Sequence, residues 1–218
     1  LPPMVSPSPS RDGAASAGRA VCFATADLPD EQRWADVRWR LDGGPLLIVG
    51  PLGSGVTSTL ATIATSLARD NAPDHLHLAV IDAGVGALLA LRSLPHAGDV
   101  LAVTERERLE RFARWANGEL ERRRARRHDA AVVWGASAPR IVVLIENYAN
   151  VRSELEGPGG QWILDALHRV ITEGSELGIH VVVGADRIGA MSHAIAASCV
   201  QRVVLGARDR VVLSMAGA

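Results

Sequence analysis

Short runs of Val, Ile and Leu alternate with longer amphipathic stretches from residue 46 almost to the end of the chain. Such alternation is typical of a parallel sheet with helices on both faces. The strands of that kind of sheet are apolar throughout, because both of their faces are covered. The strands predicted in this way are residues 46–49, 77–81, 141–145, 180–184 and 202–205.

Three longer segments have helical patterns, at residues 56–70, 105–127 and 161–176. In the third segment apolar residues recur at intervals of three and four, which predicts a helix lying on a sheet. Gly178 is placed to end that helix. We therefore predict a three-layer α/β domain, with a mainly parallel central sheet flanked by helices.

The first 19 residues differ in composition from the rest of the chain. They are rich in Pro, Ser, Gly and Ala, which predicts a flexible linker. Residues 20–218 are predicted to form one folded domain, since 48% hydrophobic residues suffice for a buried core. The chain begins with Leu1 rather than Met, and we expect it to be part of a longer protein.

Overall charge and cysteine content point to no particular partner. The formal charge is −1 and the pI is near 6.7, so net charge gives no argument for nucleic acid. No apolar run approaches the roughly 20 residues of a membrane span, so we expect a soluble segment without membrane insertion. Cys22 and Cys199 lie far apart without a secretory signal pattern, and we interpret them as structural thiols in a reducing compartment.

Residues 46–58 have the pattern of a phosphate-binding loop. An apolar strand leads into Gly-Pro-Leu-Gly-Ser-Gly-Val-Thr-Ser, and a helical pattern follows. In a G-x-x-x-x-G-K-[ST] loop the backbone N–H groups hold phosphate, the lysine reaches the β- and γ-phosphates, and the hydroxyl binds Mg²⁺. The residues predicted to contact nucleotide are Gly50, Gly53, Ser54, Gly55, Val56, Thr57 and Ser58.

Val56 stands where this pattern requires lysine. All 23 basic residues of the chain are arginines, so no other lysine can replace it. The N–H groups and Thr57 remain, whereas the charge that stabilises a transferring phosphoryl group is lost. We expect nucleotide binding to survive better than catalysis; the alternative is a plain strand-to-helix turn without a ligand.

The predicted strand at 141–145 is followed by Glu146 and Asn147. In phosphate-loop ATPases an acid at the first position supports Mg²⁺, and a glutamate at the second polarises the attacking water. Glu146 and Thr57 are therefore the candidate Mg²⁺ ligands. A neutral Asn147 cannot act as a general base, so a second catalytic part is missing. The alternative for Glu146 is a solvated side chain at the strand end.

Polar residues at two other strand ends would lie at the same edge of the sheet. Arg187 follows the strand at 180–184 and is a candidate phosphate sensor, or an arginine offered to a neighbouring domain. The alternative is an ion pair with Asp186. Asp82 follows the strand at 77–81 and is interpreted first as a turn-forming residue. His180 is interpreted as a strand histidine whose ring nitrogens have hydrogen-bond partners.

The predicted helix at 105–127 ends in a dense basic run, in which residues 122–127 are Arg-Arg-Arg-Ala-Arg-Arg. Earlier positions mix glutamates with arginines and carry an apolar stripe, and cations suit a helix C-terminus. A solvated helix face is therefore favoured over a contact with DNA or another partner.

These elements together resemble the FtsK/SpoIIIE branch of the additional-strand P-loop ATPases, and most of all the EccC-type ATPases of actinobacterial type VII secretion. The resemblance covers residues 20 to 218. It includes the segment Ala-Asp-Leu-Pro-Asp-Glu-Gln-Arg at 26–33, the strand and turn at 80–88, and Ala-Asp-Arg at 185–187.

The resemblance implies a P-loop NTPase fold of the RecA or additional-strand type, with ATP and Mg²⁺ as the cofactors of the family. It implies a module in a string of ATPase domains, on the cytoplasmic side of the membrane, in a larger membrane-anchored protein. Neighbouring modules and small helical secreted proteins would be its partners. Because later modules are often degenerate, Val56 and Asn147 favour a regulatory or substrate-binding pseudo-ATPase with weak or absent ATP binding.

Two other hypotheses remain open. The chain could be an active ATPase in which an arginine, such as Arg187 or one from a neighbour, handles the phosphate charge. It could also be a DNA-translocating FtsK-like module, which only the arginine run at 122–127 favours.

Overall fold

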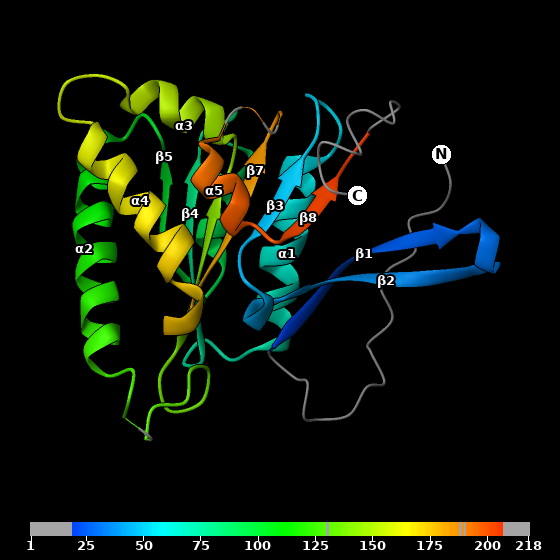
Figure 1. The fold of residues 1–218 in the computed structure, drawn as a ribbon, viewed down its shortest axis with the longest axis horizontal. Coiled ribbons are helices and arrows are strands. Elements are labelled where there is room, and N and C mark those ends of the chain that lie inside the picture. Colours follow the sequence, from blue (N-terminus) through cyan, green and yellow to red (C-terminus); the bar gives the residue numbers. More distant parts are fainter. Residues whose placement is uncertain (1–18, 130, 188, 190, 207–218) are drawn as a thin grey trace.

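The computed structural model describes residues 19–206, apart from residues 130, 188 and 190. Its centre is a six-stranded sheet in the order β5-β4-β6-β7-β3-β8, in which every strand pair is parallel. Helices lie on both faces of this sheet, and a two-stranded ribbon extends to one side (Figure 1). The predicted three-layer α/β fold is confirmed, while the predicted linker lies outside the described residues except for Arg19.

The strands of the sheet include all five that the apolar runs predict, together with β5. They are β3 (Leu46–Val49), β4 (Leu76–Asp82), β5 (Ala97–Ala102), β6 (Arg140–Ile145), β7 (Ile179–Ala185) and β8 (Gln201–Val204). The helices are α1 (Val56–Asp70), α2 (Arg106–Ala125), α3 (Tyr148–Leu155), α4 (Gln161–Glu173) and α5 (His193–Ser198). Short 3-10 helices lie at Pro29–Glu31, Leu41–Gly43, Ala87–Ser93 and Ser175–Leu177.

The core has two halves, one on each face of the sheet. Successive side chains of a strand point to opposite faces, so Val143 packs with α2 and α4 while Leu144 packs with α1. The predicted helix at 161–176 ends at Glu173 and continues as the 3-10 helix Ser175–Leu177. Gly178 ends this segment in the left-handed conformation, with φ 69°.

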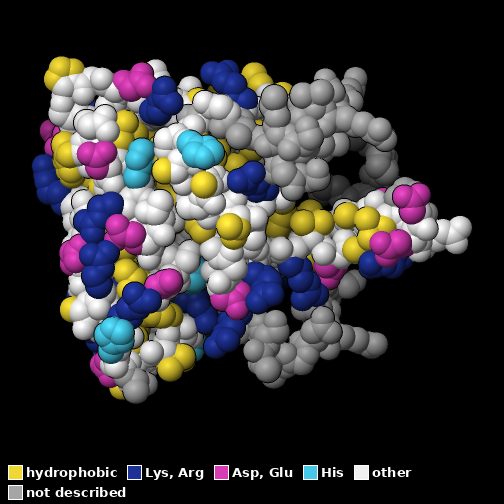
Figure 2. Space-filling view, in the orientation of Figure 1, with side chains coloured by type: hydrophobic (Ala, Val, Ile, Leu, Met, Phe, Trp, Pro, Cys, Tyr) yellow, Lys and Arg dark blue, Asp and Glu magenta, His cyan; other side chains and the backbone are white. Residues whose placement is uncertain are grey.

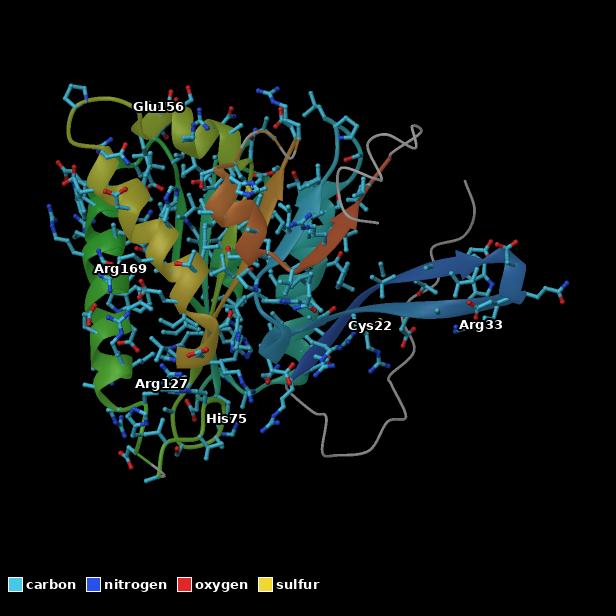
Figure 3. The ribbon with its side chains drawn as sticks, in the orientation of Figure 1. Cys22, Arg33, His75, Arg127, Glu156 and Arg169 are labelled. Atoms are coloured by element: carbon cyan, nitrogen blue, oxygen red, sulfur yellow. The ribbon has the colours of Figure 1, made fainter. Side chains whose placement is uncertain are left out.

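The ribbon is an antiparallel hairpin of β1 (Ala20–Leu28) and β2 (Arg33–Arg40). Phe23 and Trp39 at its base are buried in the core half that contains α1. Hydrophobic side chains follow the ribbon toward a charged tip (Figure 2), where Arg33 lies (Figure 3). The segment at 26–33 that carries part of the family resemblance therefore forms the tip of this hairpin.

Two further features bear on the class of protein. None of the helices in the described part of the chain is both long and apolar enough to cross a bilayer. Both cysteines are free thiols, and burial raises the pKa of Cys199 to about 11.

Candidate functional site

The loop between β3 and α1 has the backbone of a phosphate-binding loop. Gly53 and Gly55 have φ values of 81° and 102°, which side chains other than glycine rarely adopt. Gly50 is required for a different reason, because a Cβ atom there would lie 2.2 Å from the Ser54 hydroxyl oxygen. The glycine spacing seen in the sequence therefore corresponds to a tightly wrapped loop.

This loop is tied to the sheet and faces a cavity. The Gly50 N–H donates to the Ala185 carbonyl of β7 at 3.1 Å. The first N–H groups of α1 have no acceptor within the helix, as at any helix N-terminus. The cavity of about 270 Å³ is lined by residues 50–53 and 55–58 together with Gly84, Val85, Glu146, Asn147, Ala185 and Asp186.

The Val56 side chain packs toward β7, while the residue itself belongs to the loop that lines this cavity. A Cβ atom on Gly184 would lie 2.8 Å from Val56 Cγ1, so the glycine makes room for the valine side chain. Val56 also packs on the core half that contains α1. The position of the expected lysine is thus part of the packing between α1 and the sheet, and a phosphate gains no charge from it.

Among the described residues that line the cavity, the charged side chains are two acids, Glu146 and Asp186. An anionic phosphate group next to carboxylates is disfavoured electrostatically unless a cation compensates. The loop therefore offers the hydrogen-bond donors of a phosphate site, but the described residues that line the cavity supply no positive charge.

Glu146 lies directly beside the loop and is buried, with 4% of its surface exposed. The Thr57 hydroxyl donates to one carboxyl oxygen, and the Gly84 N–H donates to the other at 3.1 Å. Burial raises the pKa of Glu146, and the neighbouring Asp82 carboxyl raises it further against these hydrogen bonds. The hypothesis of a solvated glutamate at the strand end is wrong.

Asp82, at the end of β4, accepts hydrogen bonds from the backbone N–H groups of Gly84, Gly86 and Leu88 at 2.8 to 3.2 Å. Its interpretation as a turn-forming residue is confirmed. Its proximity to Glu146 follows from the pairing of β4 with β6, which the sequence alone does not specify. Two buried carboxyl groups therefore lie together behind the loop.

Asn147 has a structural role that explains its identity. It adopts the left-handed conformation with φ 46° and ψ 67°, which asparagine tolerates better than most residues. Its side chain accepts a hydrogen bond from the Asn150 N–H at 3.3 Å and caps α3. The residue at the position of the general base is therefore engaged as a helix cap.

Arg187 is an exposed residue that pairs with Asp186 at 3.3 Å, with 73% of its side chain accessible. It lines a separate cavity of about 140 Å³ with Arg152, Ser153 and Glu156 of α3. Of the three interpretations made from the sequence, the structure displays the ion pair with Asp186, and Arg187 does not belong to the described lining of the loop cavity.

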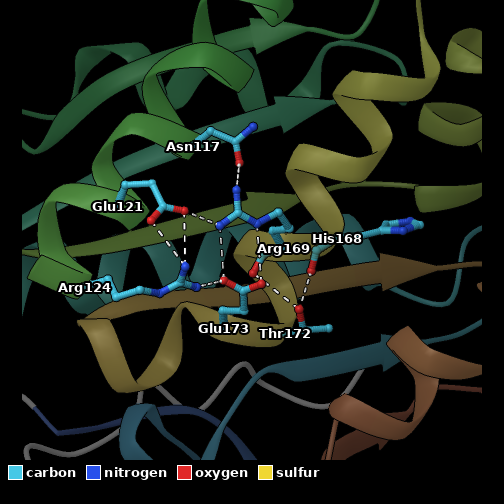
Figure 4. A network of polar contacts seen from close by, with 7 residues as sticks. All are labelled: Asn117, Glu121, Arg124, His168, Arg169, Thr172 and Glu173. Carbon is cyan, nitrogen blue, oxygen red and sulfur yellow. Dashed lines mark hydrogen bonds and ion pairs between the residues drawn. The ribbon is translucent and has the colours of Figure 1, made fainter. Parts of the chain in front are cut away.

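The arginines at residues 122–127 all have acidic partners. Arg122 and Arg123 pair with Glu119 at 2.6 and 2.5 Å, Arg126 with Asp129 at 3.8 Å, and Arg127 with Glu176 at 2.6 Å. Arg124 joins a network with Arg169, Glu121, Glu173 and Asn117 that links α2 to α4 (Figure 4).

Arg123 differs from its neighbours because only 1% of its side chain is exposed. Its guanidinium donates to the carbonyls of Leu177, Gly178 and Pro139 at 2.8 to 3.0 Å and lies 4.4 Å from the Trp134 ring centroid. This part of the basic run belongs to the core.

His180, the second residue of β7, is also buried. The expectation that its ring nitrogens have hydrogen-bond partners is wrong. Neither ring nitrogen has a hydrogen-bond partner among the described residues. Burial lowers the pKa of His180 to about 4, and the charge of Arg140 acts in the same direction. The ring is therefore a neutral member of the core at physiological pH.

Comparison with known proteins gives a consistent result. Residues 24–132 match the model of the FtsK/SpoIIIE family. The chain is 29% identical over 198 residues to the ESX secretion system protein EccC of Geobacillus thermodenitrificans, covering 86% of the chain and 13% of that protein. It is 26% identical over 188 residues to the type VII secretion system protein EssC of Staphylococcus aureus, covering 82% and 12%. The chain thus spans about an eighth of the length of these relatives.

Solved structures have the same fold. EssC (ATPases 2 and 3) from Geobacillus thermodenitrificans matches with a TM-score of 0.79 and 26% identity, over 99% of this chain and 42% of that one. The EccC ATPases 2 and 3 of Thermomonospora curvata, solved in complex with a signal sequence peptide, match with a TM-score of 0.76 and 24% identity, over 93% and 40%.

Proposed function

Because the chain belongs to the FtsK/SpoIIIE family, we propose that it is a degenerate ATPase module of a type VII secretion translocase. In this proposal the module binds ATP weakly or not at all, and it does not hydrolyse ATP alone. Its role is regulatory, or the binding of substrates and partners. The similarity to EccC and EssC proteins supports the secretion system, and the loop supports the degeneracy.

The observation that carries the proposal is the packing of Val56 against Gly184. A lysine at that position would stabilise charge on the transferring phosphoryl group, whereas valine supplies none. The capping role of Asn147 supports the same conclusion, because it removes the expected general base on an independent segment.

The residues present fit a nucleotide with Mg²⁺ in part. The loop backbone and the N-terminus of α1 suit phosphate oxygens. Thr57 and Glu146 would hold Mg²⁺, which prefers oxygen ligands. When bound, the ion would offset phosphate charge near the two acids that line the cavity. Within this chain, Gly84 and Thr57 keep the Glu146 carboxyl oriented toward the loop.

A working ATPase is the second candidate function, and the hydrogen bond from Thr57 to Glu146 favours it. This contact keeps the two candidate Mg²⁺ ligands side by side. A DNA-translocating module has less support, because every arginine of the run at 122–127 has an acidic partner.

We further propose that the partners are neighbouring ATPase modules and small helical secreted proteins. Two observations support this: solved relatives contain ATPases 2 and 3 in one chain, and one of them holds a signal sequence peptide. The proposed location is the cytoplasmic side of the cell membrane, as a domain of a larger membrane-anchored protein.

Isothermal titration of Mg²⁺-ATP into the purified chain, with ADP as comparison, tests the proposal that the module binds ATP weakly or not at all. Weak saturable binding without phosphate release would support a regulatory nucleotide. An absence of heat at millimolar ATP would support a loop kept as a docking scaffold. ATP turnover by the isolated chain would contradict the proposal and favour the working ATPase.

A further inference from the structure

A second cavity lies between α2 and the edge of the sheet formed by β4 and β5. Its volume is about 450 Å³, whereas the cavity at the phosphate loop has about 270 Å³. The described residues that line the two cavities do not overlap. Small-molecule sites in proteins typically have volumes of roughly 300–1,000 Å³ and mostly apolar walls. The second cavity is therefore large enough for a small ligand of its own.

This cavity is open because small residues lie opposite α2 at the sheet edge. Ala79 of β4 packs in the core half that contains α2 and has only a methyl group there. The neighbouring strand β5 contributes Gly98, which has no side chain. β5 is the edge strand of the sheet, and α2 lies along it (Figure 1). Space therefore remains between the strands and the large side chains of α2.

The wall on the α2 side is aromatic. Phe112 is buried with 2% of its surface exposed, whereas Trp115 is 47% exposed. Their ring centroids are 5.6 Å apart, and the ring planes are inclined by 38°. Ile141 of β6 adds an aliphatic side chain to the lining. Aromatic rings stabilise a stacked or tilted partner beyond the area that they bury, so this wall suits an apolar ring.

Arg111 contributes a positive charge to the same cavity. Every other arginine of α2 forms an ion pair, but the guanidinium of Arg111 has no ion pair or hydrogen bond with a described residue. Arg111 and Trp115 are four residues apart, so their side chains are neighbours on one helix face. Asp99 also lines the cavity, but Arg108 holds its carboxylate at 2.6 Å. The unpaired charge in the described lining is therefore positive.

We propose that this cavity binds a small amphipathic acid, an apolar ring that carries one carboxylate, sulfonate or phosphate group. The Arg111 guanidinium binds the anionic group, because its planar fork forms two-point hydrogen bonds with such oxygens. The apolar ring packs against Trp115 and Phe112. The site shares no lining residue with the phosphate loop, so the inference does not depend on nucleotide binding.

The test uses two fluorescent probes of similar shape, the anion anilinonaphthalene sulfonate and the uncharged N-phenylnaphthylamine. The full chain at pH 7 and low salt should bind the anion saturably at one site. We expect Arg111→Gln to weaken anion binding about tenfold and Arg111→Lys to recover part of the loss. The uncharged probe should change less than twofold in Arg111→Gln, and Trp115→Ala should weaken both probes.

Arg114→Gln is the matched control, because Arg114 is exposed on the same helix and does not line the cavity. This variant should bind the anion within twofold of the original chain. Equal thermal unfolding midpoints of the variants would exclude a folding defect. A nuclear magnetic resonance titration of the original chain needs no variant to bind: the indole N–H signal of Trp115, assigned with Trp115→Phe, should shift with the anion.

Three results would overturn the inference. The first is an absence of saturable anion binding to the original chain. The second is an affinity of Arg111→Gln within twofold of the original chain, or an equal loss for the charged and uncharged probes. The third is a shift of the indole signal of the exposed Trp34 without one at Trp115, which would place the probe on the β1–β2 ribbon. None of these results would bear on the proposed function of the phosphate loop.

Discussion

The C-terminal end of α2 carries five arginines within six residues, whereas the described lining of the phosphate loop carries none. At the end of α2 the positive charges are all paired, and one of them is buried. At the loop, two acids line the cavity and the lysine position is filled by valine. The region with the most positive charge is therefore structural, and the region that would bind an anion is short of it.

The comparison shows that the number of charges in a segment says little about their availability. A guanidinium with four protein partners, such as Arg123, cannot be released to a ligand without taking its donors from three carbonyls and leaving the buried Glu119 with only the exposed Arg122 as partner. Conversely, the loop keeps a backbone suited to phosphate although it lacks the expected lysine. The glycines determine the backbone conformation, and a different residue, Val56, occupies the position that would carry the charge.

The largest effect should come from Arg123→Leu. Glu119 and three carbonyl groups lose their buried donor, and breaking such a pair costs about 3–5 kcal/mol of the free energy of unfolding. Arg124→Ala is the control, since its exposed pairs are worth less than about 1 kcal/mol. Urea unfolding of both variants measures the difference. Similar losses would contradict the distinction between a buried and a solvated arginine within this run.

The pH dependence of the free energy of unfolding tests whether His180, in the core at β7, is buried in its neutral form. His180 has a pKa of about 4 in the folded chain, so the unfolded chain takes up its proton first as the pH falls. Stability should therefore decrease between pH 6.5 and 4, with a contribution from His180 of about 3 kcal/mol. His180→Phe should lose this contribution, whereas substituting the exposed His77 with Phe should leave it unchanged. Parallel pH profiles for all three chains would count against the account.

Val56→Lys adds a positive charge to the phosphate loop, the region that is short of it. The lysine would leave the contact with Gly184 and add one positive charge at the phosphates, which should raise ATP affinity about tenfold, or roughly 1.4 kcal/mol. Thr65→Lys, on an exposed position of α1, is the control for added charge. Calorimetric titration measures both. Equal small gains would mean that general electrostatics, rather than the loop position, controls binding.

The smallest effect is expected for Glu146→Gln. Burial raises the pKa of Glu146, so the folded chain resists its ionisation, and stability is lost as pH rises above the unfolded pKa toward the folded one. The neutral variant should be more stable than the original chain at pH 7, and this advantage should shrink toward pH 4. Glu154→Gln, at an exposed position of α3, serves as the control. A destabilised Glu146→Gln at pH 7 would instead indicate that the ionised carboxylate is stabilising.

Much of the fold could be predicted because the central strands are continuous apolar runs. β6 and β7 are covered on both faces; β6 consists of Ile, Val and Leu after Arg140, and β7 has three consecutive valines at its centre. β5 escaped prediction because it is an edge strand whose apolar run is interrupted by Gly98 and Asp99. The β1–β2 hairpin escaped because its turn lacks a glycine signal; Gln32 supplies the positive φ there.

The site was only partly predictable for a different reason. The loop and the strand-end Glu146 are local patterns, and the sequence places them. The contact between Val56 and Gly184 and the proximity of Asp82 to Glu146 depend on strand order, which one sequence does not specify. The cap formed by Asn147 depends on a left-handed residue at a helix start, and the sequence signal for that helix is only eight residues long.

The most direct test of the central claim is γ-phosphate release by the purified chain at several millimolar Mg²⁺-ATP, with Thr57→Ala as the inactive reference. The account predicts a rate that cannot be distinguished from that of the reference, even where calorimetry detects ATP binding. Turnover well above the reference, abolished by Thr57→Ala, would mean that the chain hydrolyses ATP without a loop lysine or a general base at Asn147, and would contradict the account.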